Sequence, residues 1–192
     1  MYTTMIAIDI VAFGQRCHDT HTQRRVRHEL YERLSEAFAM TNLPWAACHR
    51  EDRGDGVLIV MPAEVNATHC LDPLAHHLAV LLRGHNRFAS DATRLRIRTA
   101  VHHGYVERDD HGVFSPATVH LFRLLEAPAF KKALQAAGTD LGVIVSDTLY
   151  TEAVQRGGNL VVPSAYKQLW INCKEVRRAR AWLWLSPHHS DH

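Results

Sequence analysis

The sequence predicts an α+β fold, a sandwich in which helices pack on a mostly antiparallel sheet. One observation is that helical segments are interspersed with hairpin signals, whereas a parallel sheet would alternate single strands with helices. The other is the chain itself, which has 192 residues, 46% of them hydrophobic and 22% charged. Such a chain can bury a substantial core, and it contains no internal repeat and no linker rich in Pro, Gly or Ser. We therefore expect a single domain over residues 1–186 and a flexible tail at 187–192.

The first unit is predicted to be a strand followed by a helix. In residues 2–11 large apolar side chains alternate, at Ile6, Ile8 and Ile10, as they do along a strand. The next segment has apolar residues every four positions, which is typical of one face of a helix, at Val26, Leu30, Leu34 and Phe38.

A hairpin and a second helix follow. Apolar segments 46–52 and 57–61 flank Arg53-Gly54-Asp55-Gly56, and a Gly/Asp-rich link of this kind favours a β-hairpin. Leucines at helical spacing then predict a helix that ends near residues 84–86, the leucines being Leu71, Leu74, Leu78 and either Leu81 or Leu82.

The second half of the chain repeats the mixture of strands and helices. Residues 95–102 read as a strand, Gly104 permits a tight bend, and residues 105–113 read as a return segment with a polar tip. Pro116 suits the first turn of a third helix that runs to Glu126. The remaining predicted elements are helices at 129–136 and from Asp147, and strands at 142–145, 166–173 and 178–185.

Charge and composition exclude several classes of function. The 22 Lys+Arg against 20 Asp+Glu leave a net charge of +2, which does not support a basic nucleic-acid face over the whole protein. No apolar stretch reaches the about 18 residues of a membrane span, and no signal peptide is evident. We expect a cytoplasmic protein that binds neither membrane nor nucleic acid. Its cysteines, which form no C-x-x-C pair, are expected to be reduced thiols: Cys17, Cys48, Cys70 and Cys173.

Two acids stand out as candidate site residues. Asp9 lies within the most hydrophobic strand, where an ionised carboxylate is costly unless a cation, a metal or N–H donors compensate it. Asp55 lies in the hairpin tip between two glycines. Either residue also has an ordinary interpretation, because Asp9 could cap a turn at an exposed sheet face and Asp-Gly is a preferred turn pair. Together, however, they could bring two carboxylates to one sheet edge, as a two-metal phosphoryl-transfer site requires.

Four segments in order resemble the motifs of the class III nucleotidyl cyclases, the adenylyl and guanylyl cyclase catalytic domains. Residues 7–13, AIDIVAF, resemble the opening D-I-x-x-F motif, and residues 53–56, RGDG, resemble the G-D-G hairpin. Residues 98–104, RTAVHHG, resemble the R-x-G-I-H-x-G strand, and residues 143–147, VIVSD, resemble the late strand-to-helix step. The resemblance implies a ferredoxin-like palm that forms a head-to-tail homodimer.

The resemblance also implies roles for individual residues. Asp9 and Asp55 would hold Mg²⁺ or Mn²⁺, with help from the carbonyl of Ile10, because hard divalent ions take oxygen ligands. The amides of the following turn would cradle the phosphates of a nucleoside triphosphate. The residues of this turn are Ala12, Phe13 and Gly14.

The helix that would complete the site departs from the family pattern. Where the family has V-N-x-A-x-R-L-E, this sequence has residues 119–126, VHLFRLLE, so that His120 replaces the Asn and Leu124 replaces the Arg. A protonated His120 could substitute in part, or it could be an ordinary helix-surface residue. Arg123 is adjacent to position 124 but about 100° round the helix, so it reaches the site only if the helix is rotated or shifted.

The positions that would select the base are also unusual. Glu51 matches the guanine-type choice, since a carboxylate accepts hydrogen bonds from the N1–H and N2 amine of guanine, but it could equally be a solvated strand residue. Its partner position is Val113, which is apolar. The resemblance thus implies a divergent cyclase that forms a 3′,5′-cyclic nucleotide and pyrophosphate. The alternative is a catalytically degenerate nucleotide sensor or signalling adaptor that keeps the cyclase fold.

Overall fold

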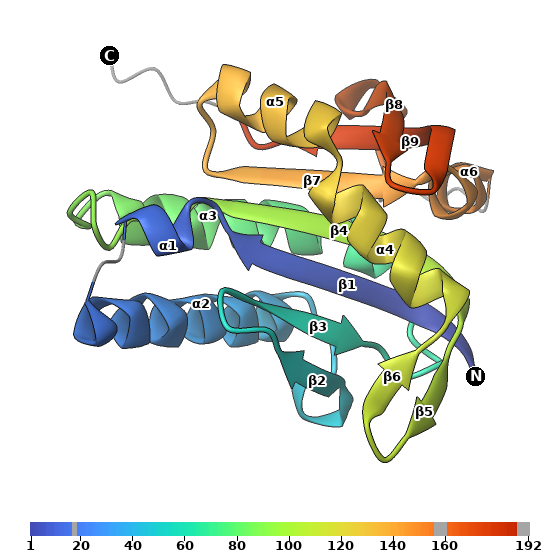
Figure 1. The fold of residues 1–192 in the computed structure, drawn as a ribbon, viewed down its shortest axis with the longest axis horizontal. Coiled ribbons are helices and arrows are strands. Elements are labelled where there is room, and N and C mark those ends of the chain that lie inside the picture. The colour runs from blue at the N-terminus through green and yellow to red at the C-terminus, as the bar shows by residue number, and fades with distance from the viewer. Residues whose placement is uncertain (17–18, 156–160, 188–192) are drawn as a thin grey trace.

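A seven-stranded sheet forms the centre of the molecule in the computed structural model, which describes residues 1–16, 19–155 and 161–187 (Figure 1). The strand order is β2-β3-β1-β4-β7-β9-β8, and within the described chain every neighbouring pair is antiparallel except β4 with β7. This confirms the predicted α+β sandwich with its mostly antiparallel sheet. The strands are β1 (Tyr2–Ile10), β2 (His49–Asp52), β3 (Gly56–Val60), β4 (Ile97–Tyr105), β7 (Leu141–Ser146), β8 (Lys167–Cys173) and β9 (Val176–Leu185).

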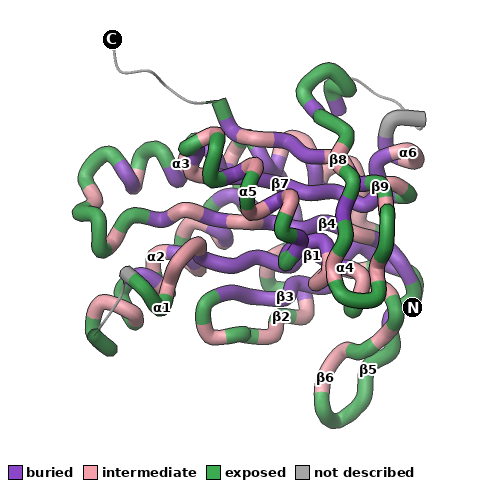
Figure 2. The backbone as a smooth tube through the Cα atoms, turned by 45° about the horizontal axis from the view of Figure 1, so that its top comes forward, coloured by how far each residue is buried: buried purple, intermediate pink, exposed green. Residues whose placement is uncertain are grey.

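Helices cover both faces of the sheet, and β1 is buried between them (Figures 1 and 2). The side chains of Ile6 and Ile8 face a core formed with α2 (Thr20–Met40), α3 (Leu74–Asn86) and α6 (Asp147–Gln155). The alternate residues Met5 and Ala7 face a second core formed with α4 (Pro116–Glu126) and α5 (Pro128–Ala137). Both sets of alternating side chains of β1 are therefore buried, one in each hydrophobic core, and neither set faces solvent.

The positions of most elements agree with the sequence prediction, and two details do not. Residues 105–113 do not return along β4, because β5 (Glu107–Asp109) and β6 (Gly112–Phe114) pair with each other in a separate two-stranded sheet. Gly104 is not a bend but lies within β4, where an added Cβ would be 2.6 Å from the Cβ of Ala117. Glycine is needed there so that α4 can pack closely on the strand.

Short elements complete the chain. Helix α1 (Phe13–Arg16) follows β1, and 3₁₀ turns occupy Trp45–Ala47, Ala67–Cys70 and Pro163–Ala165. The first of these turns replaces the beginning of the strand predicted at 46–52. Cys48, Cys70 and Cys173 are free thiols, as expected, whereas Cys17 and residues 188–192 of the predicted tail lie outside the described residues. Within the described ranges, none of the helices has the length and apolar character needed to cross a membrane.

The tight pairing of β1 with β3 gives a stability prediction. An added Cβ at Gly56 would lie 1.9 Å from the carbonyl oxygen of Ile8, a backbone atom that cannot move without opening the sheet. We expect Gly56→Ala to lower the free energy of unfolding by about 3 kcal/mol, at the upper end of the usual cost of overpacking. Gly84 in α3 is the matched control, because its added Cβ would meet nothing within 4 Å. Gly84→Ala should be neutral or stabilise by up to about 1 kcal/mol in the same urea titration, and equal effects of the two variants would contradict the prediction.

Candidate functional site

Asp9 is a buried carboxylate held by an arginine from the neighbouring strand. It is the penultimate residue of β1 and lies opposite Gly56 of β3 and Arg98 of β4. Its side chain is buried, with 7% of the residue exposed. Arg98 donates two hydrogen bonds to it, from Nε to Oδ1 at 2.8 Å and from its terminal nitrogen to Oδ2 at 2.6 Å. Asp9 is therefore not on an exposed sheet face, and it does not act as an ordinary turn cap. The cation that compensates the buried charge of Asp9 is Arg98. It lies directly opposite Asp9 in the antiparallel pairing of β1 with β4, so knowledge of that register would have identified it.

Asp55 lies at the same corner of the sheet. Its backbone carbonyl accepts a hydrogen bond from the amide of Ile10 at 2.9 Å, which fastens the β2–β3 hairpin tip to the end of β1. The pKa of Asp9 lies above its ordinary value: burial raises it, the hydrogen bond and charge of Arg98 oppose this, and the charges of Glu126 and Asp55 add to the increase. The charges of Asp55 and Glu126 thus act on Asp9, and the exposed Glu126, which pairs with Lys131, is an influence that the sequence did not reveal.

The donor set fits a shared metal ion better than a metal cage made by the protein alone. Both carboxylate oxygens of Asp9 already accept from Arg98, although each carboxylate oxygen has a second lone pair. Asp55 is exposed at the hairpin tip. In the described part of the chain no three His, Cys, Asp or Glu side chains form a group that could hold a metal ion. A Mg²⁺ or Mn²⁺ ion at Asp9 and Asp55 would therefore have to take most of its oxygen ligands from water and from a bound phosphate, as Mg²⁺ commonly does.

The turn after Asp9 leaves space beside its backbone. Ala12 has a left-handed conformation with φ 57°, and its carbonyl accepts from the amide of Gln15 at 3.1 Å as α1 begins. A Cβ added at Gly14 would meet nothing within 4 Å. The predicted phosphate cradle, Ala12, Phe13 and Gly14, thus lies next to Asp9 and Ile10 in an open position.

The two positions predicted to select the base meet each other. Oε1 of Glu51 accepts a hydrogen bond from the amide of Val113 at 2.7 Å and lies 3.0 Å from Nε2 of His49, while Oε2 accepts from Arg53 at 2.7 Å. Burial raises the pKa of Glu51, but these hydrogen bonds and the charge of Arg53 outweigh burial and lower it. Glu51 is therefore ionised and engaged by its own chain, and its role as a base reader stays a prediction.

The residues of α4 predicted to act in catalysis contact partners other than Asp9 within the chain. The ring of His120 packs against that of His102, with centroids 4.9 Å apart, and burial lowers the pKa of His120. Arg123 donates to Glu175 of the β8–β9 turn at 2.8 Å. Leu124 is fully buried in the core beneath α4. His120 is thus half-buried, its lowered pKa favours the neutral imidazole, and Arg123 is directed to a different partner from Asp9.

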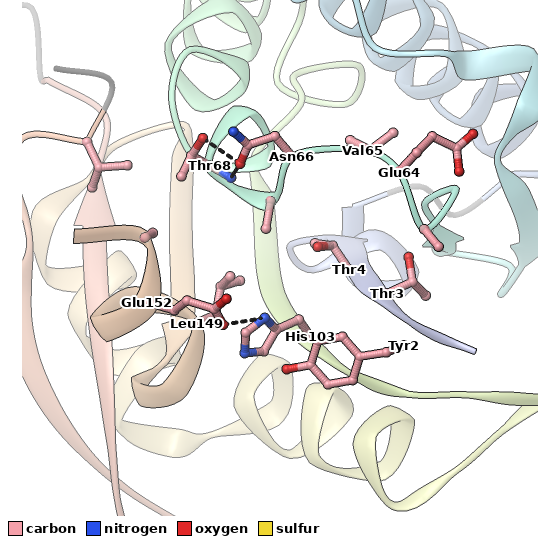
Figure 3. Close-up of a pocket in the computed structure, with 14 residues that line it drawn as sticks. Tyr2, Thr3, Thr4, Glu64, Val65, Asn66, Thr68, His103, Leu149 and Glu152 are labelled. Atoms are coloured by element: carbon pink, nitrogen blue, oxygen red, sulfur yellow. Dashed lines mark hydrogen bonds and ion pairs between the residues drawn. The ribbon is translucent and has the colours of Figure 1, made fainter. Parts of the chain in front are cut away.

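A pocket of about 410 Å³ lies near the opposite end of β1 (Figure 3). Tyr2, Thr3 and Thr4 line it together with His103 and Glu152, whose Nδ1 and Oε2 atoms are 3.3 Å apart. None of the residues that the sequence singled out for a site lines this pocket.

The fold just described is shared with solved structures of cyclases. The chain aligns over 97% of its length with 98% of an adenylate/guanylate cyclase/hydrolase from Silicibacter pomeroyi, at 19% identity and a TM-score of 0.67. It aligns over 96% of its length with 91% of the guanylyl cyclase Cya2, at 14% identity and a TM-score of 0.64. The chain has the fold of the class III nucleotidyl cyclase domains.

A third structure with this cyclase fold is the catalytic core of a rhodopsin-guanylyl cyclase with converted specificity, in complex with ATPαS. The chain aligns over 95% of its length with 93% of that protein, at 15% identity and a TM-score of 0.64. The sequence matches no protein-family model and no curated protein. The likeness therefore concerns the backbone, and the side chains of the site have to be judged from their own geometry.

The buried Asp9–Arg98 pair of this cyclase fold gives a second prediction. Breaking a buried ion pair from one side leaves an uncompensated charge, so Arg98→Met should lower the free energy of unfolding by about 3–5 kcal/mol. Adding Asp9→Asn to Arg98→Met should recover part of this loss, because the charge left behind is then removed. Arg94→Met, which breaks a more exposed pair with Asp140, should cost less than about 1 kcal/mol. Urea unfolding of the four proteins measures these values, and a loss in Arg98→Met no larger than in Arg94→Met would contradict the argument.

His102 gives a third prediction, which concerns pH. Burial, reinforced by the neighbouring His120 and His103, lowers the pKa of His102 from 6.5 to about 3. Because the unfolded chain binds this proton near pH 6.5 and the folded chain does not, stability falls as the pH drops below 6.5, by about 1.4 kcal/mol per pH unit until pH 3 is approached. NMR titration should show a neutral His102 ring at pH 5.

The control for this titration is the exposed His111 of the β5–β6 tip. His102→Asn should flatten the pH dependence of unfolding between pH 6.5 and pH 4, whereas His111→Asn should leave it unchanged. A His102 ring that gains its proton near pH 6 would show that the site is wetter than the packing indicates.

Proposed function

We propose that the protein is a divergent nucleotidyl cyclase-type domain that binds a nucleoside triphosphate at the corner formed by Asp9, Asp55 and the turn at 12–14. The products would be a 3′,5′-cyclic nucleotide and pyrophosphate. The observation that carries the proposal is the convergence of Asp9 and Asp55 at the end of β1, in a fold shared over 97% of the chain with an adenylate/guanylate cyclase/hydrolase.

Each residue of the corner has a role that its chemistry supports. Asp9 and Asp55 would hold Mg²⁺ or Mn²⁺, beside the carbonyl of Ile10. A bound divalent ion would supply charge neutralisation of the phosphates and a lower pKa for the ribose 3′-hydroxyl. The amides of Ala12, Phe13 and Gly14 would donate to the phosphate oxygens. Arg98 fixes the orientation of the Asp9 carboxylate through its two hydrogen bonds and so acts as a positioning residue.

The remaining groups of the site would come from a second copy of the chain. Within one chain His120 contacts His102 and Arg123 contacts Glu175, so neither reaches the phosphates held at Asp9. A head-to-tail homodimer would place α4 of one protomer over the corner of its partner, and Arg123 would exchange the exposed Glu175 for substrate. Glu51 would then exchange its bond to the amide of Val113 for a bond to the base, and Val113 would contact the base across the same interface.

A second candidate function is supported by the chemistry of α4. Leu124 carries no charge and is fully buried, and the lowered pKa of His120 keeps that ring neutral near pH 7. Loss of a transition-state cation costs several orders of magnitude in rate. A chain that binds the nucleotide without converting it, as a sensor or signalling adaptor, keeps the same corner and differs only in turnover.

The fourth prediction is a turnover measurement that separates the two functions. ATP, GTP, CTP and UTP are each incubated with the protein and Mg²⁺ or Mn²⁺, and cyclic nucleotide and pyrophosphate are quantified. We expect at least one nucleotide to be converted, and Asp9→Asn or Asp55→Asn to reduce the rate by at least about 100-fold, because the metal carboxylates are lost. Asp91→Asn, an exposed aspartate outside the corner, is the matched control and should retain the rate.

Calorimetric titration with the same nucleotides and metals decides the outcome when no product is found. Binding that disappears in Asp9→Asn supports the sensor function and excludes the enzyme. Absence of both turnover and binding overturns the proposal altogether. If turnover is found, co-expression of Asp9→Asn with a His120→Ala/Arg123→Ala chain tests the shared site. Only the mixed dimer rebuilds one intact site, so about a quarter of the wild-type activity should return when each variant alone is inactive.

A further inference from the structure

A second cleft, of about 640 Å³, opens at the same end of the sheet as Asp9 but between other elements. Its walls are the C-terminal end of α3, the turn at 138–140 that precedes β7, and Ser186 and Pro187 after β9. In Figure 1 these segments lie beyond the end of the sheet toward which β1 runs. The cleft shares no lining residue with the corner formed by Asp9, Asp55 and the turn at 12–14.

The cleft is strongly electropositive. Three of its lining residues are arginines, Arg83, Arg87 and Arg94, and the acidic residue among the lining side chains is Asp140. Arg94 already neutralises Asp140 through contacts of 3.1 and 3.2 Å. Arg83 and Arg87, one helical turn apart, have no acidic partner among the residues that the structure describes, so within that part of the chain two positive charges of the lining are uncompensated.

The other polar groups of the wall are engaged by the protein itself. The hydroxyl of Thr139 bonds to that of Ser186 and to its carbonyl. The side-chain amide of Asn86 donates to the carbonyl of Leu95 at 2.7 Å and accepts from its amide at 2.8 Å. A ligand would therefore be recognised by the guanidinium groups, which present paired donors suited to phosphate oxygens.

The backbone connects this cleft to the candidate active site. Arg94 lies just before β4, and the carbonyl of Arg96 accepts a hydrogen bond from the amide of Val11 at 2.8 Å, immediately before the turn at 12–14. The side chain of Arg96 is directed to the carbonyls of Thr139 and Leu134 at the end of α5. The segment at 94–96 thus contacts both the wall of the cleft and the residue before the turn at 12–14.

We propose that this cleft is a binding site for a small phosphate-bearing anion, separate from the metal-dependent corner at Asp9. Arg83 and Arg87 bind the phosphate oxygens, and the Arg94–Asp140 pair forms another part of the wall. Phe88, which is 86% exposed and lies 5.5 Å from the guanidinium of Arg87, offers an aromatic face to a nucleoside attached to that phosphate. The site needs no divalent ion, so it stands whether or not the proposed cyclase function holds.

The ordinary explanation of these arginines is electrostatic compensation of the carboxyl end of α3. A basic residue in the last turn interacts favourably with the helix dipole, and Arg83 lies in that turn. This explanation requires only that Arg83 and Arg87 stabilise the helix. It predicts a lower melting temperature for variants that lack them and no binding of anions.

The fifth prediction is a calorimetric titration of the whole chain with inorganic tripolyphosphate in EDTA, so that no divalent ion is present. The variant Arg83→Gln/Arg87→Gln should bind at least about 10-fold more weakly than the wild type, because it loses charge-assisted hydrogen bonds. The matched control is Arg25→Gln/Lys132→Gln, which removes the same charge from exposed positions on α2 and α5. This control and Asp9→Asn should both bind as the wild type does.

Three other outcomes of this titration overturn the proposal. Equal weakening in both double variants means diffuse attraction rather than a site, and weakening in Asp9→Asn assigns the anion to the candidate active site. Absence of binding, with a lower melting temperature in Arg83→Gln/Arg87→Gln, supports the helix-dipole explanation.

Repeating the titration with inorganic phosphate and with a nucleoside triphosphate identifies the part of the ligand that is bound. A gain for the nucleoside triphosphate over tripolyphosphate that disappears in Phe88→Ala assigns the nucleoside to the aromatic face.

Discussion

The structure depends on a carboxylate placed at the end of a strand that is buried on both faces. β1 pairs with β3 and β4 and contributes to both hydrophobic cores, so Asp9 cannot turn away from the sheet to reach water. Burial of an ion costs several kcal/mol unless a partner compensates it. The antiparallel register supplies that partner by placing Arg98 directly opposite. The hydrogen bond from Ile10 to Asp55 then fixes the hairpin tip beside this pair, so the geometry of the corner follows from the packing of one strand.

Local patterns in the sequence predicted the helices and strands well, because the spacing of apolar residues along the chain matches the period of the element that buries them. The alternation at Ile6, Ile8 and Ile10 and the four-residue spacing from Val26 to Phe38 each match an observed element, β1 and α2. The predictions were wrong where a tertiary contact decides the backbone. Gly104 reads as a bend, yet it continues a strand because Ala117 packs against it, and no local pattern in the sequence reports that contact.

In the candidate site, too, local sequence patterns identify some residues, whereas others depend on tertiary contacts. Asp9 and Asp55 could be singled out because a buried acid and a glycine-flanked acid are unusual in sequence. Their neighbours Arg98 and Glu126 come from other elements and depend on register and helix docking. His120 shows how far docking can change an interpretation: the sequence allowed an imidazolium near phosphate, whereas packing against His102 favours the neutral ring. Nothing in its spacing indicates that environment, since the pKa depends on what α4 is packed against.

The near-neutral composition conceals a division of charge at one end of the sheet. At the corner Arg98 pairs with Asp9 and Lys131 pairs with Glu126, whereas the charge of Asp55 repels a bare phosphate unless a cation joins the group. Arg83, Arg87 and Arg94 gather around one aspartate, and that excess of positive charge attracts a phosphate without any metal. A phosphorylated ligand in a metal-free solution would thus favour the cleft at α3, and the addition of a divalent ion would make the corner at Asp9 competitive. The two sites differ in what they require of the solution, which is why metal dependence distinguishes them better than affinity does.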